Sequence, residues 1–182
     1  MKRLILIFLS IIFCFSIISC GEKSKSEIPS GTEIGNILPS FDAYVFDENG
    51  LTGEKIDPTK TRKVTVINFW ATWCGYCLDE LPYFDRMAQE YKDSVEFVAI
   101  HSASSFSDDA INYVRSDYKD SEITFAKDSL NSYGGDVAYS LCGGKGYLPY
   151  TVIINQAGVI TYKTSGQIPE ILLEYEIENA LG

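Results

Sequence analysis

The stretch from Thr65 to Pro82, TVINFWATWCGYCLDELP, decides how the rest of the chain is interpreted. Its first part is rich in β-branched and aromatic residues, which favour a buried strand. Two cysteines separated by two residues follow, Cys74 and Cys77. Apolar residues then continue at the spacing of one helix face, at Phe84, Met87 and Ala88. The sequence therefore predicts a central strand that turns into a helix, with both cysteines at the turn.

The position of the cysteines has chemical consequences. The first N–H groups of a helix lack partners within the helix, and the aligned peptide dipoles favour negative charge there. A thiol at this position ionises more readily than a free thiol, whose pKa is about 8.5, and the thiolate is the nucleophile. We therefore expect Cys74, at the helix tip, to be the exposed attacking thiol. Cys77, one turn inside, is expected to be the shielded thiol that resolves a mixed disulfide.

The motif Phe69–Cys77, FWATWCGYC, resembles the active site of thioredoxin-fold thiol–disulfide oxidoreductases. With Asn68, Glu80 and Pro82 it is most similar to the membrane-tethered TlpA/ResA branch, and the resemblance spans residues 41–181. It implies an α/β thioredoxin fold, a central mixed sheet flanked by helices, with an N-terminal β-hairpin extension. In this branch a glutamate three residues after the second cysteine handles protons, and Glu80 occupies that position. Thioredoxin has a buried aspartate where this chain has Asn68.

The resemblance also implies a cis-proline loop opposite the dithiol, at Leu148-Pro149, directly before the predicted strand YTVIIN. The backbone of such a loop pairs with an extended substrate segment. The plain alternative is an ordinary proline at the start of a strand. The residues expected to bind substrate are Trp73, Gly75, Tyr76, Leu148 and Pro149.

Two other interpretations of the cysteine pair are open. A structural zinc site needs four ligands, and the only other soft candidates are His101 and Cys142, which are far apart in the sequence. A purely structural disulfide would close so small a loop that it would constrain the unfolded chain little. A redox dithiol is therefore favoured, without a metal and without an organic cofactor.

The remaining candidate residues have plain structural alternatives. Glu80 can be a solvated acid in the first helical turn, where the helix dipole favours it. His101 ends a predicted strand, and we assign it a structural role. Cys142 is taken as a small buried hydrophobic residue, with a regulatory or additional resolving thiol as the alternative. Trp70 and Trp73 are assigned mainly to packing, and Trp73 also to the border of the substrate groove.

The amino terminus predicts the compartment. Lys2-Arg3 is followed by an apolar run over residues 4–18, which is shorter than the roughly 20 residues of a spanning helix and fits a signal peptide. The run ends in IISCG at residues 17–21, which resembles a bacterial lipobox. We therefore expect a lipoprotein signal peptide at 1–19, a flexible tether at 20–36 with a lipidated Cys20, and a thioredoxin-like domain at 37–182. The alternative is that the apolar run is not cleaved and serves as an N-terminal anchor helix. Both interpretations place the domain outside the cytoplasm at a bacterial membrane.

Composition agrees with one domain behind a targeting segment: 182 residues, of which 46% are hydrophobic. The chain carries 15 Lys and Arg against 25 Asp and Glu, a formal charge of −10, which argues against nucleic acid as a partner. The expected strands lie at 41–46, 64–70, 95–100, 123–125, 150–155 and 159–163. One helix is expected to begin at the cysteine pair and end near residues 91–93, and a second is capped by Asp108-Asp109. Two more are expected at 137–141 and at 169–181, the last with Pro169 as its first residue.

We therefore expect the protein to be a lipid-anchored monomer that reduces disulfides in exported proteins, for example apocytochrome c. A membrane thiol reductase is the expected electron donor. One rival is a peroxiredoxin-like peroxidase, whose motif has Thr three residues before the attacking cysteine; here Thr72 lies two before Cys74. The other is a non-catalytic metal-handling lipoprotein that uses the dithiol, which usually needs a nearby histidine or methionine.

Overall fold

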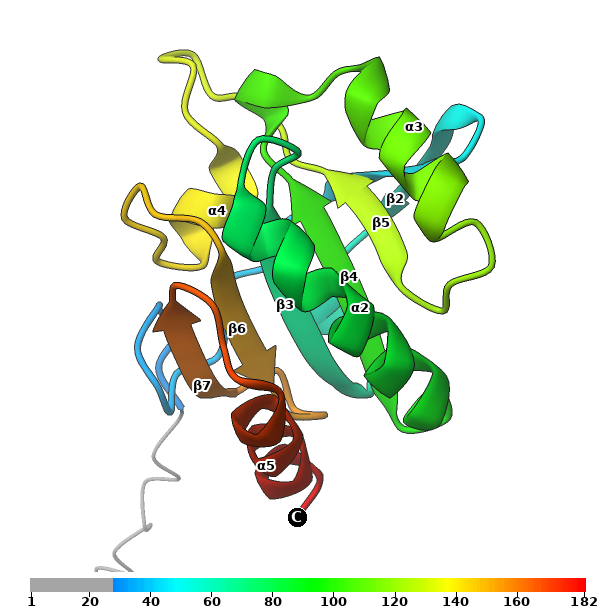
Figure 1. Ribbon diagram of the computed structural model, residues 1–182. Coiled ribbons are helices and arrows are strands. Elements are labelled where there is room, and N and C mark those ends of the chain that lie inside the picture. The colour runs from blue at the N-terminus through cyan, green and yellow to red at the C-terminus, as the bar shows by residue number, and fades with distance from the viewer. Residues whose placement is uncertain (1–27) are drawn as a thin grey trace, which may run out of the picture.

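A seven-stranded mixed sheet forms the centre of the protein, in the order β2-β1-β5-β4-β3-β6-β7 (Figure 1). The structure is a computed structural model that describes residues 28–182. The strands are β1 (Ala43–Asp47), β2 (Gly50–Ile56), β3 (Val64–Trp70), β4 (Val95–His101), β5 (Thr124–Lys127), β6 (Tyr150–Ile154) and β7 (Ile160–Ser165). The α-helices are α2 (Gly75–Glu90), α3 (Asp108–Asp117), α4 (Val137–Leu141) and α5 (Glu170–Leu181), with short 3-10 turns η2 (Pro58–Lys60) and η3 (Ala103–Ser105).

Strand β3 is central, and all seven of its residues are buried. It pairs in parallel with β4 and antiparallel with β6, so both of its backbone edges are hydrogen-bonded. Successive side chains point to opposite faces of the sheet. Val66 and Trp70 pack on one face and Ile67 and Phe69 on the other. The chain leaves β3 at a fixed point of the core and enters α2 after four intervening residues, which positions the cysteine turn.

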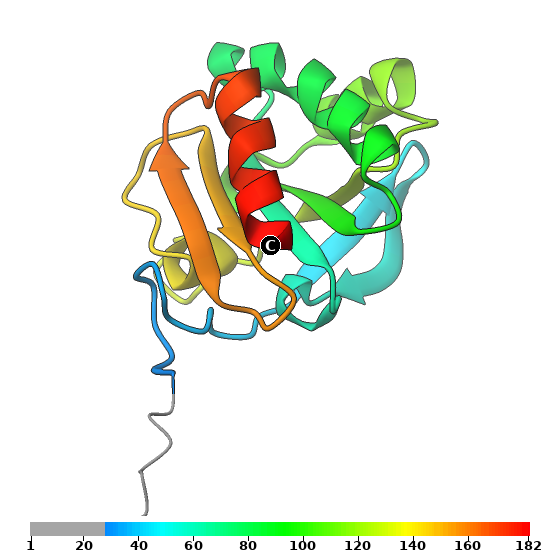
Figure 2. The ribbon, with the colours of Figure 1, turned by 90° about the horizontal axis from the view of Figure 1, so that it is seen from below.

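Helices cover the two faces of the sheet unequally (Figures 1 and 2). Helices α2, α3 and α5 pack on one face, where apolar residues such as Leu81, Val114 and Ile177 form one core cluster. The short helix α4 and the segment that contains Leu38 and Phe41 cover the other face and form a second cluster. The two layers bury β3 on both sides, as its mostly apolar sequence requires.

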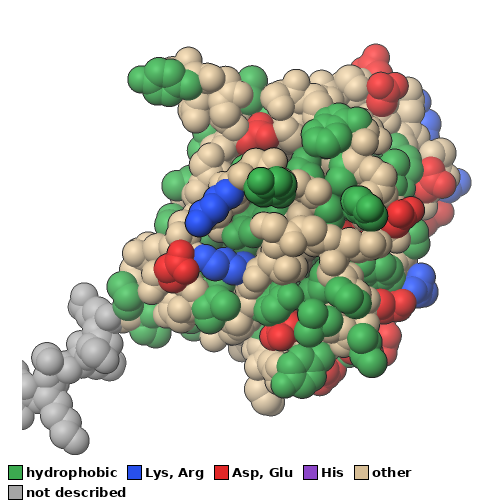
Figure 3. All heavy atoms as spheres, turned by 60° about the vertical axis from the view of Figure 1, so that its left-hand side comes forward, with side chains coloured by type: hydrophobic (Ala, Val, Ile, Leu, Met, Phe, Trp, Pro, Cys, Tyr) green, Lys and Arg blue, Asp and Glu red, His purple; other side chains and the backbone are tan. Residues whose placement is uncertain are grey.

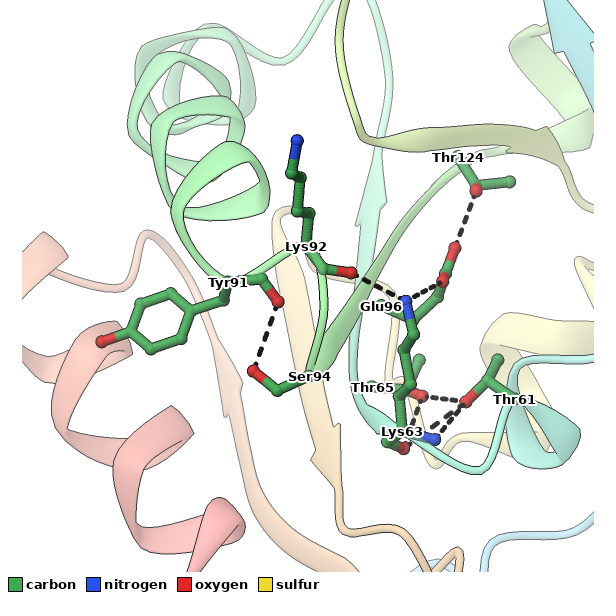
Figure 4. Close-up of polar contacts among 8 residues, drawn as sticks. All are labelled: Thr61, Lys63, Thr65, Tyr91, Lys92, Ser94, Glu96 and Thr124. Atoms are coloured by element: carbon green, nitrogen blue, oxygen red, sulfur yellow. Dashed lines mark hydrogen bonds and ion pairs between the residues drawn. The ribbon is translucent and has the colours of Figure 1, made fainter.

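The end of β3 farthest from the cysteines is fixed by polar contacts (Figure 4). Lys63 Nζ donates a hydrogen bond to the carbonyl oxygen of Lys92 at 2.8 Å and lies 3.9 Å from a carboxylate oxygen of Glu96. The hydroxyls of Thr61 and Thr65 lie 2.7 Å apart. These contacts join the start of β3 to the segment after α2 and to the start of β4, and they fix this end of the site-bearing strand.

The predicted N-terminal hairpin is present, and it adds to the sheet through β1, which pairs antiparallel with β5. Hydrogen-bonded contacts with the domain begin earlier than the predicted boundary at residue 37. Gly35 N–H donates to Ile160 O at 2.8 Å, and Ile160 N–H donates to Asn36 O at 2.9 Å. Lys163 also forms a salt bridge with Glu33 at 3.1 Å. Residues 32–36 therefore lie along the edge strand β7, a contact that their polar composition did not indicate.

The bounds of the other predicted elements agree with the structure to within about two residues. The role predicted for one residue, Pro169, differs. Pro169 has ψ of 140° and is the N-cap of α5, so the helix begins at Glu170 and not at the proline. Within residues 28–182, no helix has both the length and the apolar character needed to cross a membrane. The predicted signal peptide and residues 20–27 of the predicted tether, including the lipidation site Cys20, lie outside the described residues.

Candidate active site

The two cysteines form a disulfide at the N-terminus of α2, with a Cα–Cα distance of 5.2 Å. Cys74 is the N-cap residue, and its Sγ accepts a hydrogen bond from the backbone N–H of Cys77 at 3.3 Å. The predicted position at a helix tip is therefore confirmed. In the reduced protein the same N–H and the helix dipole would stabilise a thiolate on Cys74.

The two sulfur-bearing residues differ in exposure as predicted, but Cys74 is more covered than expected. Cys74 exposes 6% of its surface and Cys77 none. The neighbours Trp73 and Tyr76 are each 68% exposed. Large exposed side chains therefore border a nearly buried sulfur, and Cys74 is the more accessible of the two cysteines.

The Leu148–Pro149 peptide is cis, as the resemblance implied. Leu148 lines the same surface hollow as Trp73, so the proline loop lies beside the cysteine turn. The carbonyl oxygen of Pro149 accepts a hydrogen bond from Gly166 N–H at 2.8 Å and is therefore already used. No hydrogen bond among the described residues uses the backbone N–H or carbonyl of Leu148. A substrate strand that pairs with this loop would have to use Leu148.

Glu80 is fully buried and is not the solvated acid of the plain alternative. Its carboxylate accepts hydrogen bonds from Asn68 Nδ2 at 2.6 Å and from the backbone N–H of Ile168 at 3.3 Å. Burial disfavours the charged form and raises the pKa of Glu80 to about 7, although both hydrogen bonds act in the opposite direction. Glu80 follows Cys77 by three residues on α2, and both are among the helix's buried residues. A carboxyl with this pKa can accept or release a proton near neutral pH.

Asn68 connects Glu80 to the centre of the sheet. Its Nδ2 also lies 3.1 Å from the hydroxyl of Thr151, the residue directly opposite it in β6. Asn68 Oδ1 is buried and has no hydrogen-bond partner among the described residues. An amide offers both donors and an acceptor. Asn68 can therefore contact Glu80 as a donor when the carboxyl is charged and, after rotation of the amide, as an acceptor when it is protonated.

Sequence reasoning missed Thr151 and Ile168 as partners of this carboxyl. Thr151 carried a weak signal, because a polar residue within the strand sequence YTVII has to find a partner when it is buried. Ile168 contacts Glu80 only through its backbone N–H. Its carbonyl oxygen accepts a separate hydrogen bond from the hydroxyl of Tyr83 in α2. No side-chain pattern could have indicated that contact.

His101 lies beneath the active-site turn, in agreement with the structural role assigned to it. Its Nδ1 is 2.8 Å from the carbonyl oxygen of Ser102 and must therefore carry the hydrogen. Its Nε2 accepts a hydrogen bond from the backbone N–H of Thr72 at 3.2 Å. The ring is fully buried and packs edge-on against Trp70 at 4.8 Å. Burial lowers the pKa of His101, so the neutral ring is the form that holds the turn two residues before Cys74.

We expect His101→Phe to retain the ring packing on Trp70 but to leave the Thr72 N–H without its acceptor. The loss should lower the free energy of unfolding by about 1–3 kcal/mol at pH 8. Because the folded pKa of His101 lies below the unfolded value of about 6.5, the stability contributed by the neutral ring is complete above pH 6.5 and decreases as pH falls below it. The difference between wild type and variant in urea unfolding should therefore shrink on acidification. A difference that stays constant from pH 8 to pH 5 would contradict this role.

Cys142 belongs to the cluster on the other face of the sheet, whereas Cys74 and Cys77 belong to the cluster under α2. It is a free thiol and fully buried. Burial, followed by the nearby Asp128 carboxylate, raises the pKa of the Cys142 thiol well above its ordinary value. A buried thiol held protonated on the opposite face cannot take part in exchange with the pair, so the packing interpretation applies.

Comparison with known proteins agrees with this geometry. A profile of the Redoxin family matches residues 23–181. Thioredoxin-like protein YneN of Bacillus subtilis is 30% identical over 143 residues, which cover 75% of this chain and 73% of the relative. Thiol-disulfide oxidoreductase ResA of Bacillus thuringiensis is 32% identical over 146 residues, which cover 79% of this chain and 76% of the relative.

Among solved structures, a candidate thiol:disulfide interchange protein DsbE from Chlorobium tepidum superposes with a TM-score of 0.66 at 26% identity, covering 84% of this chain and 100% of that chain. StoA from Bacillus subtilis shares the fold, with a TM-score of 0.59 at 19% identity, covering 77% of this chain and 97% of that chain. The family profile, these relatives and the disulfide at the tip of α2 together show that the chain belongs to the Redoxin family and is a thiol–disulfide oxidoreductase of the ResA type with the thioredoxin fold.

Proposed function

We propose that this protein is a membrane-tethered, extracytoplasmic reductase of disulfides in exported proteins, apocytochrome c among them. The observation that carries the proposal is the combination of a helix-tip disulfide and a buried carboxyl on the same helix, whose pKa is raised to about 7. Relatives named ResA and DsbE support the activity class. The reducing direction, the exported substrates and the membrane location are the parts that we add.

The reaction proceeds in two exchanges. In the reduced protein, the Cys74 thiolate attacks one sulfur of a substrate disulfide and forms a mixed disulfide, and the first substrate cysteine leaves as a thiolate that takes a proton from water. The Cys77 thiol then gives its proton to Glu80 and attacks the Cys74 sulfur. The second substrate cysteine leaves as a thiolate that takes a proton from water, Glu80 releases its proton to water, and the Cys74–Cys77 disulfide forms. Two electrons have passed to the substrate, and a membrane thiol reductase returns two electrons to restore the dithiol.

In this proposal the cysteine pair is the only electron carrier, and neither an organic cofactor nor a metal takes part. Glu80 has a chemical task because Cys77 is fully buried and has no access to water for its proton. A carboxyl with pKa of about 7 can take that proton at neutral pH and release it afterwards.

The reduction potential of the Cys74–Cys77 couple tests the direction of electron flow. A reductase should have a potential near that of thioredoxin, about −270 mV, whereas a value near −120 mV would identify an oxidant. The fraction of oxidised protein can be measured by alkylation after equilibration in dithiothreitol and glutathione buffers of defined ratio. A value at the oxidising end would overturn the proposed direction while leaving the exchange chemistry intact.

Lipidation at Cys20 is a separate part of the proposal, since that residue lies outside the described residues. Cells grown with radioactive palmitate should label the wild-type protein, and Cys20→Ala should abolish the label. Cys14→Ala is the matched control, because Cys14 lies within the predicted signal peptide. Equal labelling of wild type and Cys20→Ala would show that the lipid is attached at another residue and would overturn the assignment of Cys20.

A further inference from the structure

A polar surface hollow of about 200 Å³ lies beside the proline loop. We name it the lysine pocket after two of the residues that line it, which are Gly143, Lys145, Tyr150, Lys163, Thr164 and Ser165. We propose that the lysine pocket is an anion-binding site that takes a carboxylate of the substrate polypeptide, from an acidic residue close to the reacting cysteine. The inference rests on the proposed function, because it names a feature of the disulfide-bearing substrates.

The fold connects the lysine pocket to the exchange site. Tyr150 directly follows the cis-proline and pairs with Ser165 of β7. The next residue, Gly166, donates its backbone N–H to Pro149 O at 2.8 Å. Two lining residues therefore adjoin the hydrogen bond that holds the proline loop. A substrate strand that pairs with Leu148 runs past this loop at about 3.3 Å per residue, so we expect a side chain a few residues from the reacting cysteine to lie at the pocket.

The charge of the pocket is opposite to that of the chain. Lys145 and Lys163 are cationic and none of the described residues that line the pocket is Asp or Glu, whereas the chain has a formal charge of −10. Lys145 is exposed and forms no ion pair within residues 28–182. Figure 3 shows a small group of Lys and Arg side chains near the middle of the visible face, while most acidic side chains lie towards one edge. The pocket therefore offers positive charge to an incoming anion.

Lys163 is held in position by the segment that lies along β7. Its Nζ donates a hydrogen bond to Thr32 O at 2.6 Å and lies 3.1 Å from a carboxylate oxygen of Glu33. Thr32 also packs against the pocket wall, since a Cβ atom at Gly143 would lie 3.0 Å from Thr32 Cβ. The side chain of Lys163 is 23% exposed and that of Glu33 is 75% exposed. The ammonium group is therefore preorganised, whereas Glu33 is an exposed partner that another carboxylate can displace.

The contact with Glu33 indicates which ligand chemistry the pocket accepts, because a carboxylate already lies against one of its two lysines. A substrate carboxylate inside the pocket would have both lysines around it. The hydroxyls of Thr164 and Ser165 form no hydrogen bond within the described residues and are further donors. An anionic membrane surface is a poorer match, because lipid headgroups are recognised by clusters of about four to eight Lys and Arg.

Peptides closed by one disulfide test the proposal. The set carries a single Glu, or its uncharged isostere Gln, at each of the four positions on either side of one cysteine in an otherwise uncharged sequence. The purified full chain is reduced with dithiothreitol, freed of reductant and mixed with each peptide, and the second-order rate constant is followed by tryptophan fluorescence. At low salt we expect Glu to react about fivefold faster than Gln in at least one position, and the ratio to fall towards one in about 1 M salt.

The net charge of the chain makes this result specific. A chain of formal charge −10 repels an acidic peptide, so long-range electrostatics alone predict a slower reaction for every Glu peptide. A preference for Glu therefore requires a local cationic site. Equal rates for Glu and Gln at every position, or slower reaction of Glu throughout, would overturn the pocket.

Two variants with effects of opposite sign assign the preference to the lysine pocket. Lys145→Gln should reduce the Glu-to-Gln rate ratio, and Glu33→Gln, which removes the competing carboxylate, should raise it. Lys119→Gln is the matched control and should retain the wild-type ratio, because Lys119 does not line the pocket. All three side chains are exposed, so the substitutions leave the core unchanged. A wild-type ratio in Lys145→Gln would overturn the proposal.

Two further outcomes are distinguishable from these. If the peptides show no preference, but vesicles that contain phosphatidylserine bind the wild-type protein and not Lys145→Gln, the pocket contacts the membrane and its assignment to substrate is wrong. Failure of the wild-type protein to reduce any peptide or protein disulfide would instead overturn the proposed function itself.

Discussion

A Cys77→Ser variant is expected to accumulate a stable one-to-one mixed disulfide with its substrate and to lose multiple turnover down to the background rate. The reason lies in the difference in accessibility, because Cys74 reaches the surface and Cys77 exposes none of its area. The first exchange needs only Cys74, so it proceeds, whereas the second lacks its nucleophile. Non-reducing electrophoresis and mass spectrometry of the variant after reaction with a disulfide-closed peptide measure the adduct.

Two further variants make this result specific. Cys74→Ser should give neither adduct nor turnover, even though it retains Cys77, because the substrate cannot reach the buried sulfur. Cys142→Ala should keep wild-type turnover, since Cys142 packs on the opposite face of the sheet from the pair. An adduct formed by Cys74→Ser would reverse the assigned roles, and loss of turnover in Cys142→Ala would show that the third thiol takes part after all.

The parts of the site that lie within one local segment could be predicted from the sequence. The run VTVINFW specifies a buried strand, and the cysteines after it follow from helix-terminus geometry alone. The cis peptide at Pro149 is different in kind, because only the resemblance to a family indicated it. The structure confirms both the cysteine turn and the cis peptide.

The parts that depend on residues far apart in the chain could not be predicted. Glu80 is surrounded by Asn68 of β3 and by the backbone of Ile168, which lies 88 positions later in the chain. His101 reaches the turn at Thr72 only because β3 and β4 run in parallel and end side by side. Sequence periodicity reports which side chains are buried, but the identity of their partners is set by tertiary packing. The electrostatics of the site therefore became clear only in the structure.

The pKa of Glu80 leads to an expected effect on stability whose sign can be worked out. The pKa rises from 4.5 for an ordinary glutamate to about 7 in the folded protein. Between these values the folded state holds a proton that the unfolded state has lost, so the free energy of unfolding of the oxidised protein decreases as pH rises from 4.5 to 7. At about 1.4 kcal/mol for each pKa unit, the full loss is on the order of 3 kcal/mol. Glu80→Gln cannot titrate and should lack this decrease, which urea unfolding between pH 4 and pH 8 measures.

The same substitution should slow the second exchange, in which Glu80 takes the proton from Cys77. General-base assistance contributes about 10²–10⁴-fold, so resolution of a preformed mixed disulfide at pH 7 should fall by a factor in this range. The first exchange should change little, because Cys74 gains its negative charge from the helix tip. Asp79→Asn is the matched control: it makes the same change of charge one residue earlier on α2, at an exposed position. If Glu80→Gln and Asp79→Asn resolve the mixed disulfide at the same rate, the buried carboxyl serves only packing, and Cys77 must lose its proton by another route.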